Sequence, residues 1–318
     1  MIVTVTPNPS LDRSASLGGP IVRGQVHRLE QISTVAAGKG VNICRALHGA
    51  GLQCLAVVPA PQHDPLLAGM SESGLPCSAV PIAEPVRTNL TVTEPDGTTT
   101  KFNAPGASID PDERSQLENA VLEAAQDAEW VVLTGSLPPG LPDDWYAHMV
   151  TRLRPSGAKI AVDTSDAPLR ALAQALPQSA PDLVKPNSVE LAQICGGDGP
   201  ELEQAASRGD LGPVTDLART LVAKGIAMAM VTLGGAGALL VTPEEAWYAV
   251  AGPIEVRSTV GSGDSSLAGL LIGLTTGAGL GESLRAAVAW GTAAAALPGS
   301  TIPLPTQAGQ VPVRLTRC

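Results

Sequence analysis

The segment Thr259–Ser266, which reads Thr-Val-Gly-Ser-Gly-Asp-Ser-Ser, combines two glycines with a carboxylate and small polar residues. An apolar helix is predicted directly after the glycines, over residues 264–276. Glycines let backbone N–H groups point inward, and a helix N-terminus adds partial positive charge. The segment therefore predicts a nest for an anion or a developing negative charge. Asp264 is either the N-cap of this helix or a base directed at the same anion, and the segment alone leaves both open.

A second glycine cluster, Gly38-Lys39-Gly40, precedes a predicted helix over residues 41–47. It is not a P-loop, because Gly40 stands where that motif has Ser or Thr, and it is not a dinucleotide fingerprint. A flexible Gly-Lys-Gly at a helix start suits a phosphate group. The other interpretation is a surface turn that carries a solvated lysine.

Two further groups of residues lie at the ends of predicted strands. Residues 232–238 form a glycine-rich turn between predicted strands 228–233 and 239–242. Lys185, Asn187 and Glu190 follow a predicted strand over 182–185 and lead into a helix. They place a cation, an amide and a carboxylate at the carboxyl edge of a sheet, where ligands of α/β proteins bind.

The elements that must position these residues alternate between strand and helix from about residue 112 onward. Short apolar runs bounded by turn residues predict buried strands, and apolar residues at helical spacing predict the helices between them. This alternation indicates parallel βα units. The predicted strands are 2–5, 130–133, 159–163, 182–185 and 228–233, and the predicted helices begin near 111, 145, 168, 188, 215, 264 and 281.

Two segments depart from this alternation. Residues 13–35 contain few helix formers, and residues 80–103 alternate apolar and polar residues around a turn signal, Pro95-Asp96-Gly97. We expect both to be excursions of strand from the α/β core that together form a small sheet over a site. No linker separates them from the core, so the sequence predicts one domain over residues 1–318 with this sheet as a lid.

Composition excludes several classes of protein. Of 318 residues, 44% are hydrophobic and 2% are aromatic, so the core must be aliphatic and stacking on nucleic-acid bases is poorly supported. The net charge is −10, but residues 1–101 hold seven Lys/Arg and seven Asp/Glu, so an anionic ligand is expected near this neutral third. Five cysteines without a C-x-x-C pair favour free thiols over disulfides or zinc. The start of the chain has no basic leader, and no apolar run reaches the roughly 18 residues of a membrane span.

Taken together and in this order, the motifs resemble those of the ribokinase-like carbohydrate kinases of the phosphofructokinase B branch. Within that branch the chain is most similar to the 1-phosphofructokinases and tagatose-6-phosphate kinases. Ser262 departs from the alanine that is usual there, which exchanges one small residue for another. The resemblance covers nearly the whole chain and is carried by Thr4–Asp12, Gly38–Asn42, Arg87–Asn89, Asp96–Gly106, Thr134–Gly140, Val162–Ser165, Lys185–Glu190, Thr232–Gly237 and Gly261–Asp264.

The resemblance implies a three-layer α/β/α core with a mostly parallel sheet and a small β-sheet lid. It also implies a role for each motif residue. Asp264 is the catalytic base, and the N–H groups of Gly261, Ser262 and Gly263 stabilise the transferring phosphoryl group. The residues expected to bind the nucleotide are Lys185, Asn187, Thr232, Gly234, Gly237 and Gly263, with an adenine slot closed by residues 287–291. Glu190 is expected to bind Mg²⁺ through water. The residues expected to bind the sugar and its phosphate are Asp12, Gly38, Lys39, Asn42, Arg87, Lys101 and Asn103.

The activity implied is ATP-dependent phosphorylation of fructose 1-phosphate at O6, with ATP and Mg²⁺ and without nucleic-acid or membrane partners, in the cytoplasm. Tagatose 6-phosphate and fructose 6-phosphate are alternative acceptors, since the motifs do not distinguish which end of the sugar carries the existing phosphate. A non-catalytic sugar-phosphate sensor is disfavoured, because a sensor needs neither Asp264 nor the complete glycine nest. An oxidoreductase is disfavoured by the absence of G-x-G-x-x-G after the first strand. Exposed edges of the lid favour a homodimer.

Overall fold

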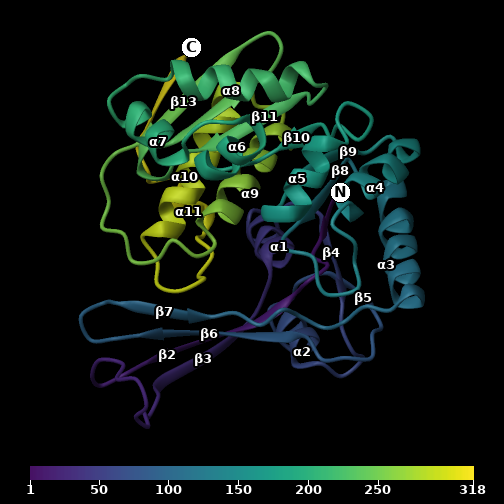
Figure 1. Ribbon diagram of the computed structural model, residues 1–318, viewed down its shortest axis with the longest axis vertical. Helices are drawn as coiled ribbons and strands as arrows, with labels where there is room; N and C mark the ends of the chain where they lie inside the picture. The colour runs from purple at the N-terminus through teal and green to yellow at the C-terminus, as the bar shows by residue number, and fades with distance from the viewer.

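The computed structural model describes all residues from Met1 to Cys318 and contains two sheets (Figure 1). The larger sheet has ten strands, and the smaller sheet has four. In spatial order the larger sheet consists of β14 (Val313–Arg317), β13 (Ala246–Ala251), β12 (Ala238–Val241), β11 (Met228–Thr232), β10 (Leu183–Val184), β9 (Lys159–Asp163), β8 (Trp130–Thr134), β1 (Ile2–Val5), β4 (Cys54–Pro59) and β5 (Cys77–Val80).

The seven strands from β11 to β5 are parallel, whereas β12, β13 and β14 extend the sheet as an antiparallel edge. All residues of β1 and β8 are buried, as expected for parallel strands that helices cover on both faces. The chain leaves β1 toward β4 on one side and returns to β8 on the other. The sheet therefore has a switch point at β1, and its carboxyl edge there is where ligands of this architecture bind.

Helices cover both faces of the large sheet and form two separate apolar cores. Ile2 belongs to one core and its neighbour Val3 to the other, because successive side chains of a strand point to opposite faces. This confirms the predicted three-layer core. On the face of Val3 lie α3 (Pro111–Ala124), α4 (Trp145–Leu153), α5 (Asp166–Gln174), α6 (Ser188–Cys195), α7 (Gly199–Ser207) and α8 (Gly212–Ala223); on the face of Ile2 lie α1 (Lys39–Gly49), α2 (Pro65–Glu72), α9 (Ser262–Thr275), α10 (Leu280–Ala295) and α11 (Pro305–Ala308).

Local signals explain where several helices begin. Asp110 is the N-cap of α3, and its carboxylate accepts from the N–H groups of Asp112 and Glu113. The helix predicted near residue 215 begins earlier, at Gly212-Pro213. The short helix α7 has no counterpart in the sequence prediction, because it begins with Gly199-Pro200, which is typical of a turn.

The small sheet is built from the two predicted excursions. Its order is β3 (Glu30–Ala37), β2 (Ser10–Ser16), β6 (Arg87–Thr93) and β7 (Thr99–Phe102). Strands β2 and β6 both follow strands of the large sheet and run outward from it, so they pair in parallel, whereas β3 and β7 return antiparallel beside them. Figure 1 shows this sheet set apart below the core. Residues 80–86, expected in the lid, instead end β5 and connect it to β6.

No helix of the chain combines the length and the hydropathy that crossing a bilayer requires.

Helices α9 and α10 pack closely because glycines lie between them. A Cβ atom on Gly269 would lie 2.6 Å from the carbonyl oxygen of Ala286. We expect Gly269→Ala to lower the free energy of unfolding by about 2 kcal/mol, since overpacking against backbone outweighs the roughly 1 kcal/mol that alanine gains in a helix. Urea denaturation measures the difference. Gly49→Ala is the control, because its Cβ would meet nothing within 4 Å; an equal loss there would refute the packing explanation.

Candidate active site

A cleft of about 1000 Å³ lies between the carboxyl edge of the large sheet and the base of the small sheet. The N-termini of α1, α6 and α9 all contribute residues to its wall. The cleft thus unites motifs that lie more than 200 residues apart in the sequence. Of the predicted site residues, its wall contains Asp12, Gly38, Lys39, Asn42, Arg87, Lys185, Asn187, Glu190, Thr232, Gly234, Gly237, Gly261, Ser262, Gly263 and Asp264.

Lys101 and Asn103 do not belong to this group. Both residues are exposed, Lys101 in the far strand β7 of the small sheet and Asn103 directly after it, and neither lines the cleft. Lys101 lies in β7 opposite Thr91 of β6. Sequence spacing could not place them, because the distance of β7 from the cleft is set by the pairing of four strands.

The start of α9 forms the predicted glycine nest. Gly261 is the N-cap in a left-handed conformation, with φ of 77°, and no side chain caps the helix. The N–H of Ser262 donates to the carbonyl of Thr259 at 3.4 Å, whereas the N–H groups of Gly261 and Gly263 have no acceptor in the protein. The interpretation of Asp264 as the N-cap is therefore wrong. The nest keeps free donors for an anion.

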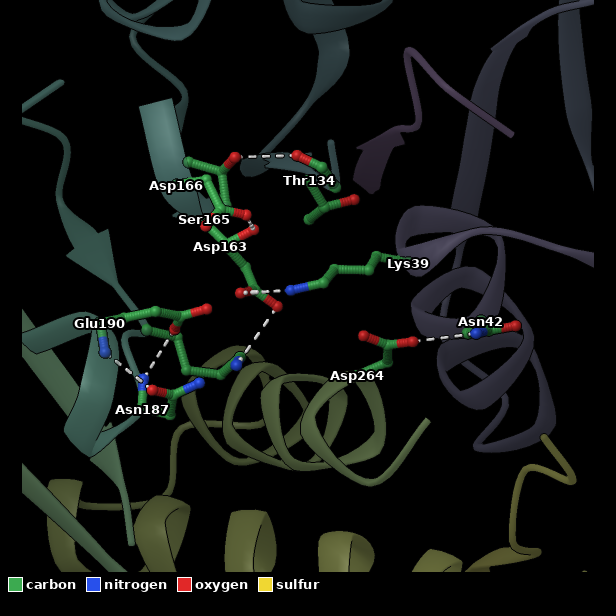
Figure 2. A network of polar contacts seen from close by, with 12 residues as sticks. Lys39, Asn42, Thr134, Asp163, Ser165, Asp166, Asn187, Glu190 and Asp264 are labelled. Atoms are coloured by element: carbon green, nitrogen blue, oxygen red, sulfur yellow. Dashed lines mark hydrogen bonds and ion pairs between the residues drawn. The ribbon is translucent and has the colours of Figure 1, made fainter. Parts of the chain in front are cut away.

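Asp264 points instead toward α1. Its side chain is almost fully buried, and its Oδ2 accepts a hydrogen bond of 2.9 Å from Nδ2 of Asn42 (Figure 2). Burial raises the pKa of Asp264 above its ordinary value, and the nearby Asp163 raises it further, whereas Lys39 and the Asn42 bond oppose this. A buried carboxylate with a raised pKa beside an anion nest is suited to general-base chemistry.

Asp163, at the end of β9, binds two lysines that line the cleft, although Asp163 itself is not part of the cleft wall. Its fully buried side chain forms ion pairs with Nζ of Lys39 at 3.0 Å and Nζ of Lys185 at 3.2 Å. Burial acts to raise the pKa of Asp163, but Lys185 and Lys39 hold it below its ordinary value. No role was predicted for this residue from the sequence. The available signal was a carboxylate at the carboxyl end of a buried parallel strand.

The interpretation of Lys39 as a solvated lysine in a surface turn is therefore wrong. Lys39 is the first residue of α1, and Figure 2 shows its side chain directed at the Asp163 carboxylate on the side where Asp264 lies. Burial acts to lower the pKa of Lys39, but the charges of Asp163 and Asp264 raise it above its ordinary value. Lys39 therefore remains protonated at neutral pH.

The two glycines around Lys39 let α1 begin against the end of β1. Gly38 has a φ of 129°, and a Cβ atom there would lie 2.6 Å from Cγ2 of Thr6. A Cβ on Gly40 would lie 2.4 Å from the Thr6 hydroxyl. This close approach carries Lys39 and Asn42 to the carboxyl edge of the sheet.

Asn187 and Glu190 cap each other at the start of α6. Asn187 Oδ1 accepts from the N–H of Glu190, and Glu190 Oε2 accepts from the N–H of Asn187. Burial raises the pKa of Glu190, and Asp163 adds to this, whereas the N–H of Asn187 opposes it. Oε1 of Glu190 has no such bond, so the residue has both a capping function and a free ligand atom facing the cleft.

The far end of the cleft is lined by the glycine-rich turn after β11. Thr232, Gly234 and Gly237 lie here, opposite Val288 and Gly291 of α10. The predicted slot at residues 287–291 thus contributes these two positions, whereas Ala287 is buried in the core. One carboxylate in this region was not predicted from the sequence.

That carboxylate is Glu203 of α7. Its Oε1 accepts from the hydroxyl of Ser188, and its side chain lies close to Gly234. Glu203 was not predicted, because no pattern in the sequence indicated the helix α7 that carries it.

At the opposite end, residues of the small sheet gather around Asp12. Its Oδ1 accepts from the hydroxyl of Ser10 at 2.8 Å and from Nδ2 of Asn89 at 3.0 Å. Arg87 donates to the carbonyls of Asn8 and Ala104, and burial lowers its pKa while Asp12 opposes this. Asn89 was not among the predicted site residues; its pairing opposite Asp12 across β2 and β6 places it there.

The chain is similar to known sugar kinases. Residues 11–307 match the model of the pfkB family carbohydrate kinases. The 1-phosphofructokinase of Rhodobacter capsulatus is 33% identical over 310 residues, which cover 96% of this chain and 93% of that protein. The ATP-dependent 6-phosphofructokinase isozyme 2 of Escherichia coli is 33% identical over 297 residues, 92% of each chain. The crystal structure of phosphofructokinase-2 from Escherichia coli in complex with potassium has a TM-score of 0.87 at 29% identity, over 97% of both chains.

The ion pairs of Asp163 predict a pH-dependent contribution to stability. Asp163→Asn leaves two lysines without their counter-charge, and we expect it to lower the free energy of unfolding at pH 7 by about 3 kcal/mol. Because the pKa of Asp163 is lowered on folding, this contribution is complete above the ordinary carboxylate pKa of about 4 and disappears as the pH falls through the lower folded value.

Urea denaturation of both proteins between pH 7 and pH 3 measures this effect. The exposed Asp143→Asn is the matched control and should leave the unfolding free energy nearly unchanged. A difference between wild type and Asp163→Asn that stays constant down to pH 3 would contradict the ion-pair explanation.

Proposed function

The chain belongs to the pfkB family of carbohydrate kinases, and we propose that it transfers the γ-phosphoryl group of ATP to O6 of fructose 1-phosphate, giving fructose 1,6-bisphosphate. One observation carries this proposal: the buried carboxylate of Asp264 shares the cleft with the unpartnered N–H groups of α9 and with the ammonium groups of Lys39 and Lys185. The choice of acceptor is supported by relatives that are named 1-phosphofructokinase.

In this proposal Asp264 accepts the proton of the attacking hydroxyl group. Its raised pKa makes it a better base than an exposed aspartate, while the hydrogen bond from Asn42 favours its ionised form. A strong base is not required, because phosphoryl transfer passes through a loose transition state in which positioning and charge neutralisation dominate.

The donors around Asp264 stabilise the charge of the phosphoryl group in transfer. The N–H groups of Gly261 and Gly263 are free for this role, and Ser262 contributes when its longer bond to Thr259 gives way. Lys185 Nζ lies 3.4 Å from the position that a Cβ on Gly263 would take, so its charge is next to the nest. Thr232, Gly234 and Gly237 then hold the rest of the nucleotide.

The residues present fit a magnesium ion. Glu190 keeps one carboxylate oxygen free toward the cleft, and Mg²⁺ in such sites is held by one or two carboxylates, several waters and substrate phosphates. Both oxygens of Asp163 face lysines, so Glu190 is the residue that would hold the ion, through water. The ion supplies positive charge to the phosphates of the nucleotide.

At the acceptor end, Asp12 and Asn89 of the small sheet supply hydrogen-bonding groups for sugar hydroxyls, and Arg87 supplies a charge for the phosphate that the sugar already carries. Lys101 and Asn103 contribute only if the small sheet moves toward the cleft. Fructose 6-phosphate is the second candidate acceptor, because a 6-phosphofructokinase is as similar in identity as a 1-phosphofructokinase. Tagatose 6-phosphate would use the same groups.

From the sequence, both Lys39 and Arg87 are expected to bind the phosphate of the acceptor. The contacts of Lys39 instead favour different roles for the two residues. Lys39 faces Asp163 and Asp264, whereas the charge that faces Arg87 is that of Asp12. We therefore assign Arg87 to the acceptor's phosphate and place Lys39 beside the phosphoryl group in transfer.

We further propose a cytoplasmic homodimer in which the small sheets of two subunits meet. Support comes from apolar side chains exposed on that sheet, Ile32, Val35 and Phe102, and from the unpaired edges of β3 and β7. A structural relative is described as a tetrameric inhibited form of phosphofructokinase-2.

The activity is tested by measuring ADP release with ATP and Mg²⁺ against fructose, fructose 1-phosphate, fructose 6-phosphate and tagatose 6-phosphate. We expect the highest kcat/KM with fructose 1-phosphate. Asp264→Asn should bind both substrates and lose at least about a hundredfold in kcat, as losses of a general base do. Sugar-phosphate binding without ADP release would establish the sensor instead, and a preference for fructose 6-phosphate would establish the second acceptor.

Substitution of Lys39 tests its assignment. Lys39→Ala should lower kcat with fructose 1-phosphate and with fructose by a similar factor, about a hundredfold, because both reactions transfer the same phosphoryl group. Lys39→Arg should restore activity only in part, since a planar guanidinium does not replace a compact ammonium. Steady-state kinetics of the three proteins on both sugars measure this. A loss confined to the phosphorylated sugar would return Lys39 to the acceptor's phosphate.

A further inference from the structure

Arg45 lies one turn after Asn42 on α1 and does not line the cleft. The side chain is partly buried, and its two terminal nitrogens have different acceptors. Nη2 donates to the carbonyl of Ala36 in β3 at 2.7 Å, and Nη1 donates to Oδ1 of Asn42 at 3.2 Å. Arg45 therefore contacts the residue that binds Asp264, but not the cleft.

The contact fixes the direction of the Asn42 amide. A guanidinium group has donors and no acceptor, so it can bind only the oxygen of the amide. With Oδ1 held by Arg45, the Nδ2 group must face Asp264, where it donates at 2.9 Å. The flipped amide would place its oxygen against the carboxylate and its NH₂ group against the guanidinium, which are two repulsive contacts.

We propose that Arg45 is a positioning residue that holds the Asn42 amide as a donor to Asp264 and thereby keeps the Asp264 carboxylate in the ionised form that can accept a proton. The inference rests on the proposed function for the role of Asp264 as a base, but the orientation of the amide stands on geometry alone.

The surroundings of Asp264 make this bond important. The charged groups that face Asp264 are Lys39 of α1, Asp163 of β9 and Lys185 beyond β10; burial and Asp163 raise its pKa, and the two lysines and Asn42 oppose them. Without Arg45 the amide of Asn42 is free to turn its oxygen toward Asp264. That oxygen can accept a hydrogen bond only from the protonated carboxyl group of Asp264. Loss of Arg45 should therefore raise the pKa of Asp264, and the activity that needs the ionised form should fall at a higher pH.

The test combines a titration with kinetics. The carboxyl ¹³C signals of aspartate-labelled protein are followed against pH in wild type and Arg45→Met, with Asp264→Asn identifying the signal. We expect the midpoint for Asp264 to rise by about one pH unit or more, as the loss of a hydrogen bond to a charged group predicts. In the pH profile of kcat, the fall on the acid side should move by the same number of pH units. The kcat at high pH and the KM for ATP should stay within about threefold of the wild-type values. Arg45→Lys should recover part of the shift.

A double-mutant cycle identifies the path of the effect. In Asn42→Ala protein, the further change Arg45→Met should shift the Asp264 midpoint no further, because Arg45 acts through Asn42. Arg152→Met is the matched control: it removes an arginine that binds Glu118, far from the cleft, and should leave the midpoint unchanged. Urea denaturation of each variant separates this shift from a general loss of stability.

Several results would overturn the inference. An unchanged midpoint in Arg45→Met would do so, and so would a shift that adds to that of Asn42→Ala. A rise only in the KM for the sugar phosphate would show that Arg45 acts through Asp12, the carboxylate whose charge acts on Arg45. The titration needs no turnover, so a failure of the proposed function, seen as full activity in Asp264→Asn, is distinguishable from a failure of this inference.

Discussion

The cleft depends on the burial of one carboxylate, that of Asp163. An unpaired carboxylate with no exposed surface would cost several kcal/mol, so this side chain must be matched by positive charge. The match comes from two other elements, since Lys39 begins α1 and Lys185 follows β10. These pairs therefore fix the N-terminus of α1 against the carboxyl edge of the sheet. The charges of the same two ammonium groups also act on Asp264, so the ion pairs that hold the cleft together also give it its charge.

Two carboxylates of the cleft wall, Asp264 and Glu190, and the buried Asp163 beside them have different environments. Asp163 has a lowered pKa because two lysines contact it, whereas burial raises the pKa of Asp264 and of Glu190. Asp163 thus carries a permanent charge that orders its neighbours. Asp264, held by an amide, and Glu190 are the groups whose protonation can change. Environment divides the roles of carboxyl groups in enzymes in this way.

The two halves of the cleft belong to different sheets. Asp12, Arg87 and Asn89 are held by the small sheet, whereas Asp264 and Lys185 are held by the core. The distance between these two groups of residues therefore depends on the position of the small sheet relative to the core. A closing movement of this sheet on substrate would exclude water and bring Lys101 and Asn103 nearer, as closure does in many enzymes whose chemistry competes with water.

Several features could be predicted from the sequence because they depend on neighbouring residues. Alternating strands and helices predicted the parallel sheet, and the Pro-Asp-Gly turn predicted the hairpin of β6 and β7. Gly38 and Gly261 have positive φ angles and marked the beginnings of two helices, where the sequence predicted anion sites, because the conformation of a single residue is a local property.

Other features were decided only by the tertiary structure, because they join residues that are distant in the chain. Asp264 was equally consistent with a cap and with a base until the fold placed Asn42 against it. The glycine cluster by itself also allowed Lys39 to be a solvated turn residue, until β9 brought the Asp163 carboxylate to 3.0 Å from its Nζ. Asn89 and Glu203 entered the cleft through strand pairing and an unpredicted helix, and Lys101 stayed outside for the same kind of reason. The sequence by itself thus determined which groups were available for chemistry, whereas packing decided which of them meet, because an ion pair or a hydrogen bond exists only where the fold brings both partners together.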